Sequence, residues 1–171
     1  TVEFDIAVRP GQTITAKGYD DVEFLISTNP GESLKPLSQV ASGGELSRIM
    51  LAIKTVLAGR DEIDTLIFDE IDTGISGRTA WKVAEQLSVL SGAHQVICIT
   101  HLPQIAAMAD VHFVIEKSST DDMTITDIHK VSAEESLAEL ARLLGSDALT
   151  EAALSNAKEM KEQAGMFKET R

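Results

Sequence analysis

The stretch "LIFDEIDTGISG" (residues 66–77) decides the fold, because an apolar strand leads into acidic residues and then into a glycine-containing turn. The apolar residues 66–68 predict a short strand that is buried on both of its faces. Asp69 and Glu70 follow at the carboxyl end of this strand. An amphipathic pattern over 77–92 then predicts a helix. This order of strand, turn and helix predicts an α/β fold.

A second strand continues the same pattern. The stretch "HQVICITH" (94–101) predicts another buried strand, which ends in a threonine and a histidine, and Pro103 opens a short helix over 103–109. The alternation of strands and helices from 65 to 116 predicts a right-handed parallel core. Ligands of such sheets bind beyond the carboxyl ends of the strands. We therefore expect the acidic pair and His101 to meet at one edge.

Further elements flank this core. Alternating residues over 2–8 and 22–28 predict two strands, and a polar "SSTDD" between apolar runs predicts a hairpin of 110–117 with 123–131. Two C-terminal helices follow, the first opened by a capping box of Ser132 with Glu135, the second over about 147–163. We expect residues 1–171 to form a single α/β domain, with a mostly parallel sheet flanked by helices.

The composition limits the kinds of partner that this chain could bind. The 171 residues carry a formal net charge of −12, which argues against broad electrostatic binding of DNA or an anionic membrane by this chain alone. Its apolar runs are too short for a transmembrane helix. The one cysteine, Cys98, lies in a predicted strand, where a buried thiol in a reducing compartment is expected. Because the chain begins at Thr1 without methionine, we expect it to be a piece of a longer protein.

The stretch "QVASGGELSR" (39–48) poses a separate question. Ser42 and Glu45 form a capping box before an apolar helix, but Gly43 and Gly44 each cost about 1 kcal/mol relative to alanine in a first turn. Bare backbone N–H groups at a helix start can bind a phosphate. A flexible loop that ends in a cap is the other interpretation, and this stretch alone does not decide between the two.

The acidic residues also allow more than one interpretation. Adjacent carboxylates after a strand suit a magnesium–phosphate site, in which one holds the hydrated metal and the other orients or deprotonates water. They could equally solvate a strand end. A stand-alone metal-dependent phosphoesterase would use Asp69, Glu70, Asp72 and His101, but it leaves the paired glycines unexplained. A non-catalytic interaction domain is a further alternative.

The order of these motifs resembles the ATP-binding-cassette ATPases, specifically the C-terminal half of an SMC-like head. "SGGE" (42–45) resembles the signature motif and "LIFDE" (66–70) resembles Walker B. "IDTGISG" (71–77) resembles the D-loop and "ITH" (99–101) the switch-histidine loop. Beyond these motifs, the sequence from about Val22 to Ala157 is similar to that of a bacterial family member that acts in DNA double-strand-break repair and recombination.

The resemblance implies roles for particular residues. The signature residues would bind the nucleotide of a second head in trans; these are Ser42, Gly43, Gly44 and Glu45. On its own head, Asp69 would hold Mg²⁺ through water, Glu70 would activate the attacking water and His101 would face the γ-phosphate of ATP. Asp72 and Gly74 would lie at the dimer seam. Side chains introduced at the glycines are then expected to block the seam rather than unfold the domain.

One departure from the family matters. A G-x-x-x-x-G-K-[ST] loop, which cradles the β-phosphate, is missing from the sequence, because "RPGQTITAKG" and "LAGRDEID" both lack its spacing and its ending. The Q-loop is not recognisable either. In an SMC-like head both parts lie in an N-terminal half, before a long coiled coil. We therefore expect this chain to hydrolyse ATP poorly or not at all alone.

The resemblance also implies partners and a location. The N-terminal half of the same head, a second head in an ATP-dependent homodimer, and DNA through the full-length protein are the expected partners. A bacterial cytoplasmic protein associated with the nucleoid is expected, with no membrane partner.

Overall fold

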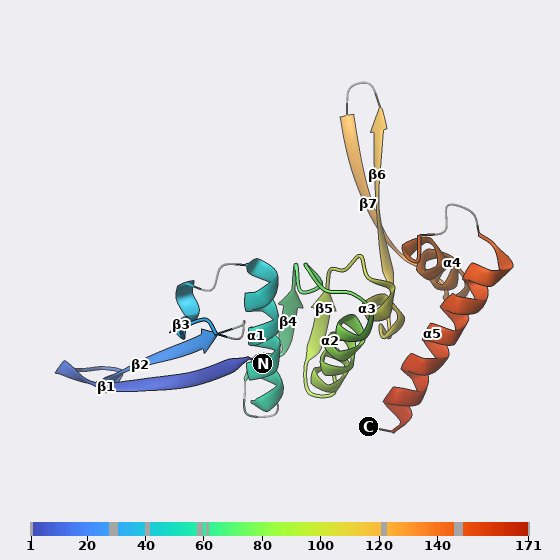
Figure 1. Cartoon of the computed structure of the whole chain (residues 1–171). Coiled ribbons are helices and arrows are strands. Elements are labelled where there is room, and N and C mark those ends of the chain that lie inside the picture. The colour runs from blue at the N-terminus through green and yellow to red at the C-terminus, as the bar shows by residue number, and fades with distance from the viewer. Residues whose placement is uncertain are drawn as a thin grey trace.

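The computed structural model describes residues 2–27, 31–39, 42–57, 60, 62–120, 123–145 and 149–170. Its described strands form three small sheets, ordered β1-β2-β3, β4-β5 and β6-β7. Figure 1 shows the elements following one another across the molecule, with two long hairpins extending from a helical centre. The α/β class expected from the sequence is confirmed.

The N-terminal sheet is a hairpin with a short added strand. β1 (Glu3–Thr15) pairs with β2 (Gly18–Ser27) in antiparallel register, and β3 (Lys35–Pro36) pairs with the end of β2, followed by the 3-10 turn η1 (Leu37–Gln39). Both predicted strands are present. β1 extends to Thr15, well beyond the predicted end at residue 8, while residue 28 lies outside the described residues.

The centre of the molecule is a parallel strand pair with its crossover helix. β4 (Thr65–Phe68) pairs with β5 (Gln95–Cys98), and α2 (Gly77–Leu90) connects them. α1 (Gly43–Val56) and α3 (Pro103–Ala107) complete the helices around this pair. Side chains from all of these elements share one core; among them are Leu51, Phe68, Ile71, Val83, Leu87, Leu90 and Ile105.

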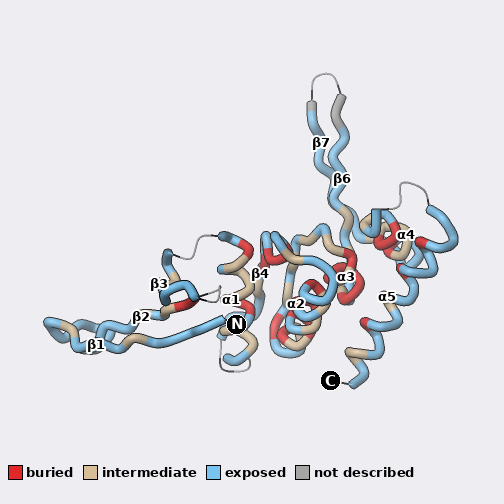
Figure 2. The backbone as a smooth tube through the Cα atoms, viewed as in Figure 1, coloured by how far each residue is buried: buried red, intermediate tan, exposed pale blue. Residues whose placement is uncertain are grey.

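The prediction that both faces of these strands are buried is wrong. Phe68 is 6% exposed and packs into the helical core, whereas its neighbour Ile67 is 68% exposed. On the adjacent strand and just after it, Ile97 and Ile99 are exposed as well. Because side chains alternate along a strand, one set faces the helices and the other faces away from them. Among the described residues, the helices therefore cover one face of this sheet. Figure 2 shows that buried residues gather in the helical part of the molecule, whereas the β1–β2 hairpin is mostly exposed.

The predicted hairpin is confirmed, whereas the parallel core does not extend to residue 116 as expected. β6 (Phe113–Thr120) pairs with β7 (Met123–Lys130) in antiparallel register, from Phe113 opposite Lys130 onward. Neighbouring strands joined by a short turn close with little loss of chain entropy, which favours this local pairing. Among the described strands, the parallel sheet therefore contains β4 and β5 alone.

Two helices close the chain as expected. α4 (Ala133–Leu143) begins with a complete capping box, in which the Ser132 hydroxyl accepts the Glu135 N–H and the Ser132 N–H donates to the Glu135 carboxylate. α5 (Glu151–Glu169) starts and ends later than predicted, with Thr150 as its N-cap. The two helices pack through small side chains, including Ala141, Ala153 and Ala157.

The molecule exposes an unusually large surface for its mass. Its accessible area is 11,707 Å², whereas a compact monomer of 18.4 kDa exposes about 8,200 Å². One face of the β1–β2 hairpin contributes to this excess, because apolar side chains of both strands are exposed there; they are Phe4, Ile6, Val8, Val22 and Phe24. The Phe4 and Phe24 rings stack at 5.8 Å. No other described part of the chain packs against this face of the hairpin.

Candidate functional site

A tight turn carries the acidic pair at the end of β4. The Asp69 carboxylate accepts the N–H of Glu70 at 2.9 Å, and the Glu70 carbonyl accepts the N–H of Thr73 at 3.0 Å. Glu70 has a φ of 57°, which places a residue other than glycine in the left-handed region. Such backbone strain persists only where the surrounding structure holds it, and it is frequent at functional sites. We call residues 69–73 the acidic turn.

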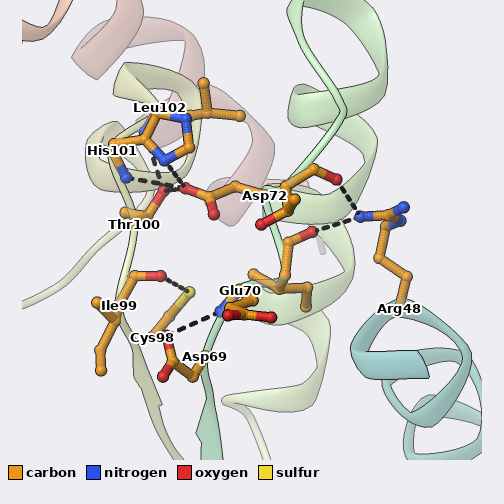
Figure 3. Close-up of polar contacts among 11 residues, drawn as sticks. Arg48, Asp69, Glu70, Asp72, Cys98, Ile99, Thr100, His101 and Leu102 are labelled. Carbon is orange, nitrogen blue, oxygen red and sulfur yellow. Dashed lines mark hydrogen bonds and ion pairs between the residues drawn. The ribbon is translucent and has the colours of Figure 1, made fainter. Parts of the chain in front are cut away.

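Asp72 connects the acidic turn to the end of β5. Its side chain is buried, and its Oδ2 accepts hydrogen bonds from the Thr100 hydroxyl at 2.6 Å and from the His101 backbone N–H at 2.8 Å. The same oxygen lies 2.9 Å from His101 Nδ1. The His101 side chain is 71% exposed, so the opposite side of the ring faces solvent. The predicted meeting of the two strand ends is therefore present (Figure 3).

The start of α1 approaches the acidic turn very closely. A Cβ built on Gly44 would lie 2.7 Å from the Glu70 carbonyl oxygen and 3.0 Å from the Thr73 Cβ, and a Cβ on Gly43 would collide with the Glu70 carboxylate. Contact with the backbone of the same chain thus explains the missing side chain at Gly44, which neither sequence interpretation offered, whereas the Glu70 side chain could move away from a Cβ on Gly43. A side chain at residue 44 is therefore predicted to displace the acidic turn of the same chain.

The predicted cap of α1 is present in part. The Ser42 hydroxyl accepts the N–H of Glu45 at 3.2 Å. The reciprocal bond, from a glutamate carboxylate to the cap backbone, is described only for the box of Ser132. Of the predicted seam residues, Gly74 is exposed with a φ of 74°, whereas Asp72 is buried inside the chain.

Two side chains of α1 bind the backbone of the acidic turn, and sequence analysis missed both. The Ser47 hydroxyl donates to the Asp69 carbonyl at 2.9 Å. Arg48 Nη1 donates to the Ile71 carbonyl at 3.0 Å and to the Thr73 carbonyl at 2.9 Å (Figure 3). The available signal was spacing: Arg48 lies four residues after Gly44, on the same side of the helix.

The acidic turn suits a magnesium ion only if the ion is held by one carboxylate together with water and phosphate oxygens. In the part of the chain that the structure describes, no group of three or more His, Cys, Asp or Glu side chains could hold a metal. Mg²⁺ is commonly held by one or two carboxylates together with waters and substrate phosphates. Asp69 suits that mode. Asp72 does not, because its Oδ2 is occupied by Thr100 and His101, and this weakens the phosphoesterase alternative.

The thiol next to the site is held neutral. Burial raises the pKa of Cys98 to about 12, and the negative charges of Asp72 and Asp69 act in the same direction. Cys98 is partly buried, as expected from the sequence, although less completely. A thiol with this pKa is a poor nucleophile at neutral pH, so we assign Cys98 no chemical role.

None of the helices among the described residues is long and apolar enough to cross a bilayer.

Sequence comparison finds close relatives, although no family profile matches the chain. The chain is 49% identical over 157 residues to DNA repair protein RecN of Bacillus subtilis (strain 168), a match that covers 92% of this chain and 27% of the relative. It is 54% identical over 143 residues to DNA repair protein RecN of Treponema pallidum (strain Nichols), covering 84% and 25%. The chain thus spans about a quarter of the length of these relatives.

Structure comparison gives the fold. The chain superimposes with a TM-score of 0.51 and 20% identity on a solved structure from work on ATP-driven dimerisation and DNA-stimulated activation of SMC ATPases. The match covers 85% of this chain and 84% of the solved chain. The fold is that of an SMC ATPase head segment, as the sequence motifs predicted.

Proposed function

Since this chain is homologous to part of the RecN DNA repair proteins and has an SMC ATPase fold, we propose that it is one half of an ATPase head. The observation that carries the proposal is the joined strand edge, where Asp72 connects the acidic turn to His101. In this arrangement, acidic side chains and a histidine lie at the ends of two parallel strands, which suits phosphoryl transfer by positioning and electrostatics.

The acidic turn supplies the chemical groups. Glu70 is the proposed general base, because its exposed carboxylate directly follows the strand-terminal Asp69. His101 is proposed to contact the γ-phosphate through its exposed ring edge, while Asp72 fixes the ring from the buried side. When bound with ATP, Mg²⁺ would neutralise phosphate charge, and Asp69 is the residue proposed to hold it through water.

The signature residues are proposed to serve a second head. Ser42, Gly43, Gly44 and Glu45 form the first turn of α1 or its cap, where the helix dipole favours an anion. Asp72 and Gly74 are proposed to transmit the state of the seam between heads. An ATP-dependent homodimer and DNA contact through the whole protein, in the bacterial cytoplasm at the nucleoid, complete the proposal.

A second half is needed for two reasons. The sequence lacks the lysine-containing phosphate loop, so the β-phosphate has no cradle here. The exposed side chains of β4 and β5, Ile67 and Ile97 among them, also form an apolar sheet face that no other described part of the chain covers. Covering this face would remove part of the excess surface that the isolated chain exposes.

The test is reconstitution. We expect calorimetric titration of the chain with ATP at millimolar Mg²⁺ to show no tight site, and we expect ATP hydrolysis to appear when the complementary Walker A segment of a RecN relative is co-expressed. Micromolar ATP binding by the chain alone would contradict the division of the site. Metal-dependent phosphoesterase activity of the chain alone would favour the alternative function instead.

A further inference from the structure

Glu70 occupies a strained backbone position that has an anchored carbonyl on each side. The Asp69 carbonyl, immediately before it, accepts a bond from Ser47, and the Ile71 carbonyl, immediately after it, accepts a bond from Arg48. A left-handed conformation costs a residue other than glycine about 1 kcal/mol or more, so neighbouring contacts must hold it. α1 provides these contacts.

We propose that Arg48 is a positioning residue, which holds the acidic turn against the start of α1 and thereby sets the place of Glu70 and Asp72. The proposal rests on the function proposed above. The two carbonyls that Arg48 binds belong to the residues on either side of Asp72, and Asp72 in turn binds His101. Hydrogen bonds at both ends of the short backbone stretch 71–73 therefore connect α1 to His101.

The chemistry of the guanidinium explains why an arginine is present. Both bonds come from the same nitrogen, Nη1, whose two N–H groups diverge in a fixed plane toward the two carbonyls. A lysine ammonium is a flexible point charge, so it can replace these bonds only in part. The absence of a side chain at Gly44 also makes room for the guanidinium, since a Cβ there would lie 3.1 Å from Arg48 Nη1.

The first test needs no nucleotide. Hydrogen exchange of the Thr73 and Ile75 amides reports the turn directly, because these amides donate to the Glu70 and Asp72 carbonyls. In Arg48→Ala we expect both amides to exchange at least tenfold faster than in the unmodified chain. The matched control is Arg142→Ala, which removes a surface arginine paired with Glu139 on α4 and should leave these amides unchanged.

The second test uses the reconstituted head. We expect Arg48→Ala to lower kcat at least tenfold and to leave the KM for ATP within twofold, because the positions of the catalytic groups change while nucleotide contacts remain. Arg48→Lys should recover part of the lost kcat. If Arg48 only stabilised the fold, its removal would not lower kcat while leaving KM unchanged, and lysine would not restore part of kcat.

The outcomes separate the two proposals. Unchanged exchange at Thr73 in Arg48→Ala, or a kcat equal to that of Arg142→Ala, overturns the role of Arg48 while the ATPase function stands. A reconstituted unmodified head without ATPase activity overturns the proposed function, and with it the catalytic role of Arg48. If Arg48→Ala does not fold, Arg48→Lys and Ser47→Ala provide the same two measurements.

Discussion

The Asp72 carboxylate holds His101 at two points, the backbone N–H at 2.8 Å and the ring Nδ1 at 2.9 Å. The Asp72 side chain is 5% exposed, while the His101 side chain that it contacts is 71% exposed. A buried acceptor thus fixes an exposed group, and the fixed group lies beside the acidic turn. The orientation of His101 is therefore a property of the fold of this chain and needs no bound nucleotide.

We predict that Asp72→Ala destabilises the chain by about 1–3 kcal/mol, because the substitution leaves the Thr100 and His101 donors without their buried acceptor. Urea unfolding followed by circular dichroism measures the effect. The control is Asp127→Ala, which breaks an exposed contact with His129 Nδ1 at 3.2 Å and should change stability by less than about 0.5 kcal/mol. Equal effects of the two substitutions would mean that Asp72 does not support the site.

Gly44→Ala should destabilise the chain by about 1–3 kcal/mol, because the added Cβ meets the Glu70 carbonyl and must displace the acidic turn. Thermal unfolding provides the measurement. Gly165→Ala is the matched control: Gly165 lies inside α5, and a Cβ there meets nothing within 4 Å. That substitution should stabilise the chain by up to about 1 kcal/mol. A Gly44→Ala protein as stable as the unmodified chain contradicts the close approach.

Glu70→Gln should keep nucleotide binding in the reconstituted head and lower turnover by about 10²–10⁴-fold, the usual effect of losing a general base. The amide keeps the size of the side chain but cannot accept the proton from water. Steady-state ATP hydrolysis, together with fluorescent nucleotide binding, separates the two effects. Near-normal turnover would remove Glu70 from its proposed role.

The Cys98 thiol should resist alkylation in the folded chain. Because its pKa is raised from 9.0 to about 12, the thiolate fraction at pH 8 falls by about 10³-fold relative to an ordinary cysteine. We expect the reaction with iodoacetamide to be at least 100-fold slower in the native chain than in 6 M guanidinium. Comparable rates in the two states would show that the thiol is neither buried nor repelled by the carboxylates.

The free energy of unfolding should fall as the pH is lowered below about 6.5. Burial lowers the pKa of His112, with the nearby Lys161 acting in the same direction, so the folded chain holds the ring neutral. The unfolded chain binds this proton first, and stability is lost as the pH falls from 6.5 through the folded pKa, by at most about 1.4 kcal/mol per pH unit.

Urea unfolding at pH 7.5 and pH 5.5 tests this pH dependence, with His112→Gln as the comparison. The variant should lose less stability between the two pH values than the unmodified chain. In this comparison Glu135 contributes little, because its lowered pKa moves its effect to more acidic pH. An equal loss in both proteins would assign the dependence to other groups.

Local patterns were sufficient to predict most elements and the meeting of the strand ends. The parallel order of β4 and β5 brings Asp72 and His101 to one edge, and that follows from alternating strands and helices. What the sequence could not indicate was how closely α1 approaches the acidic turn. The absent side chain at Gly44 serves equally for a phosphate or for a neighbouring backbone, and only coordinates distinguish the two.

The prediction that both faces of β4 and β5 are buried was wrong for a different reason. Ile67 and Ile97 lie on the exposed face of the sheet. Apolar residues on a sheet face indicate that something packs against that face, but they do not indicate whether the same chain or another chain does so. β6 does not extend the parallel sheet, because its partner is the adjacent β7, as the polar stretch between the two runs indicated. Pairing partners depend on competition between segments, which single-strand periodicity does not contain.

The large surface of this chain also has a calorimetric consequence. A compact protein of 171 residues unfolds with a heat-capacity increase of about 2.1–2.6 kcal/mol/K, which arises mainly from newly hydrated apolar groups. Here part of that apolar surface is already hydrated before unfolding, and the excess area lowers the increment by about 0.5 kcal/mol/K. The stability curve of the isolated chain is therefore flatter against temperature, and covering the open sheet face should restore part of its curvature.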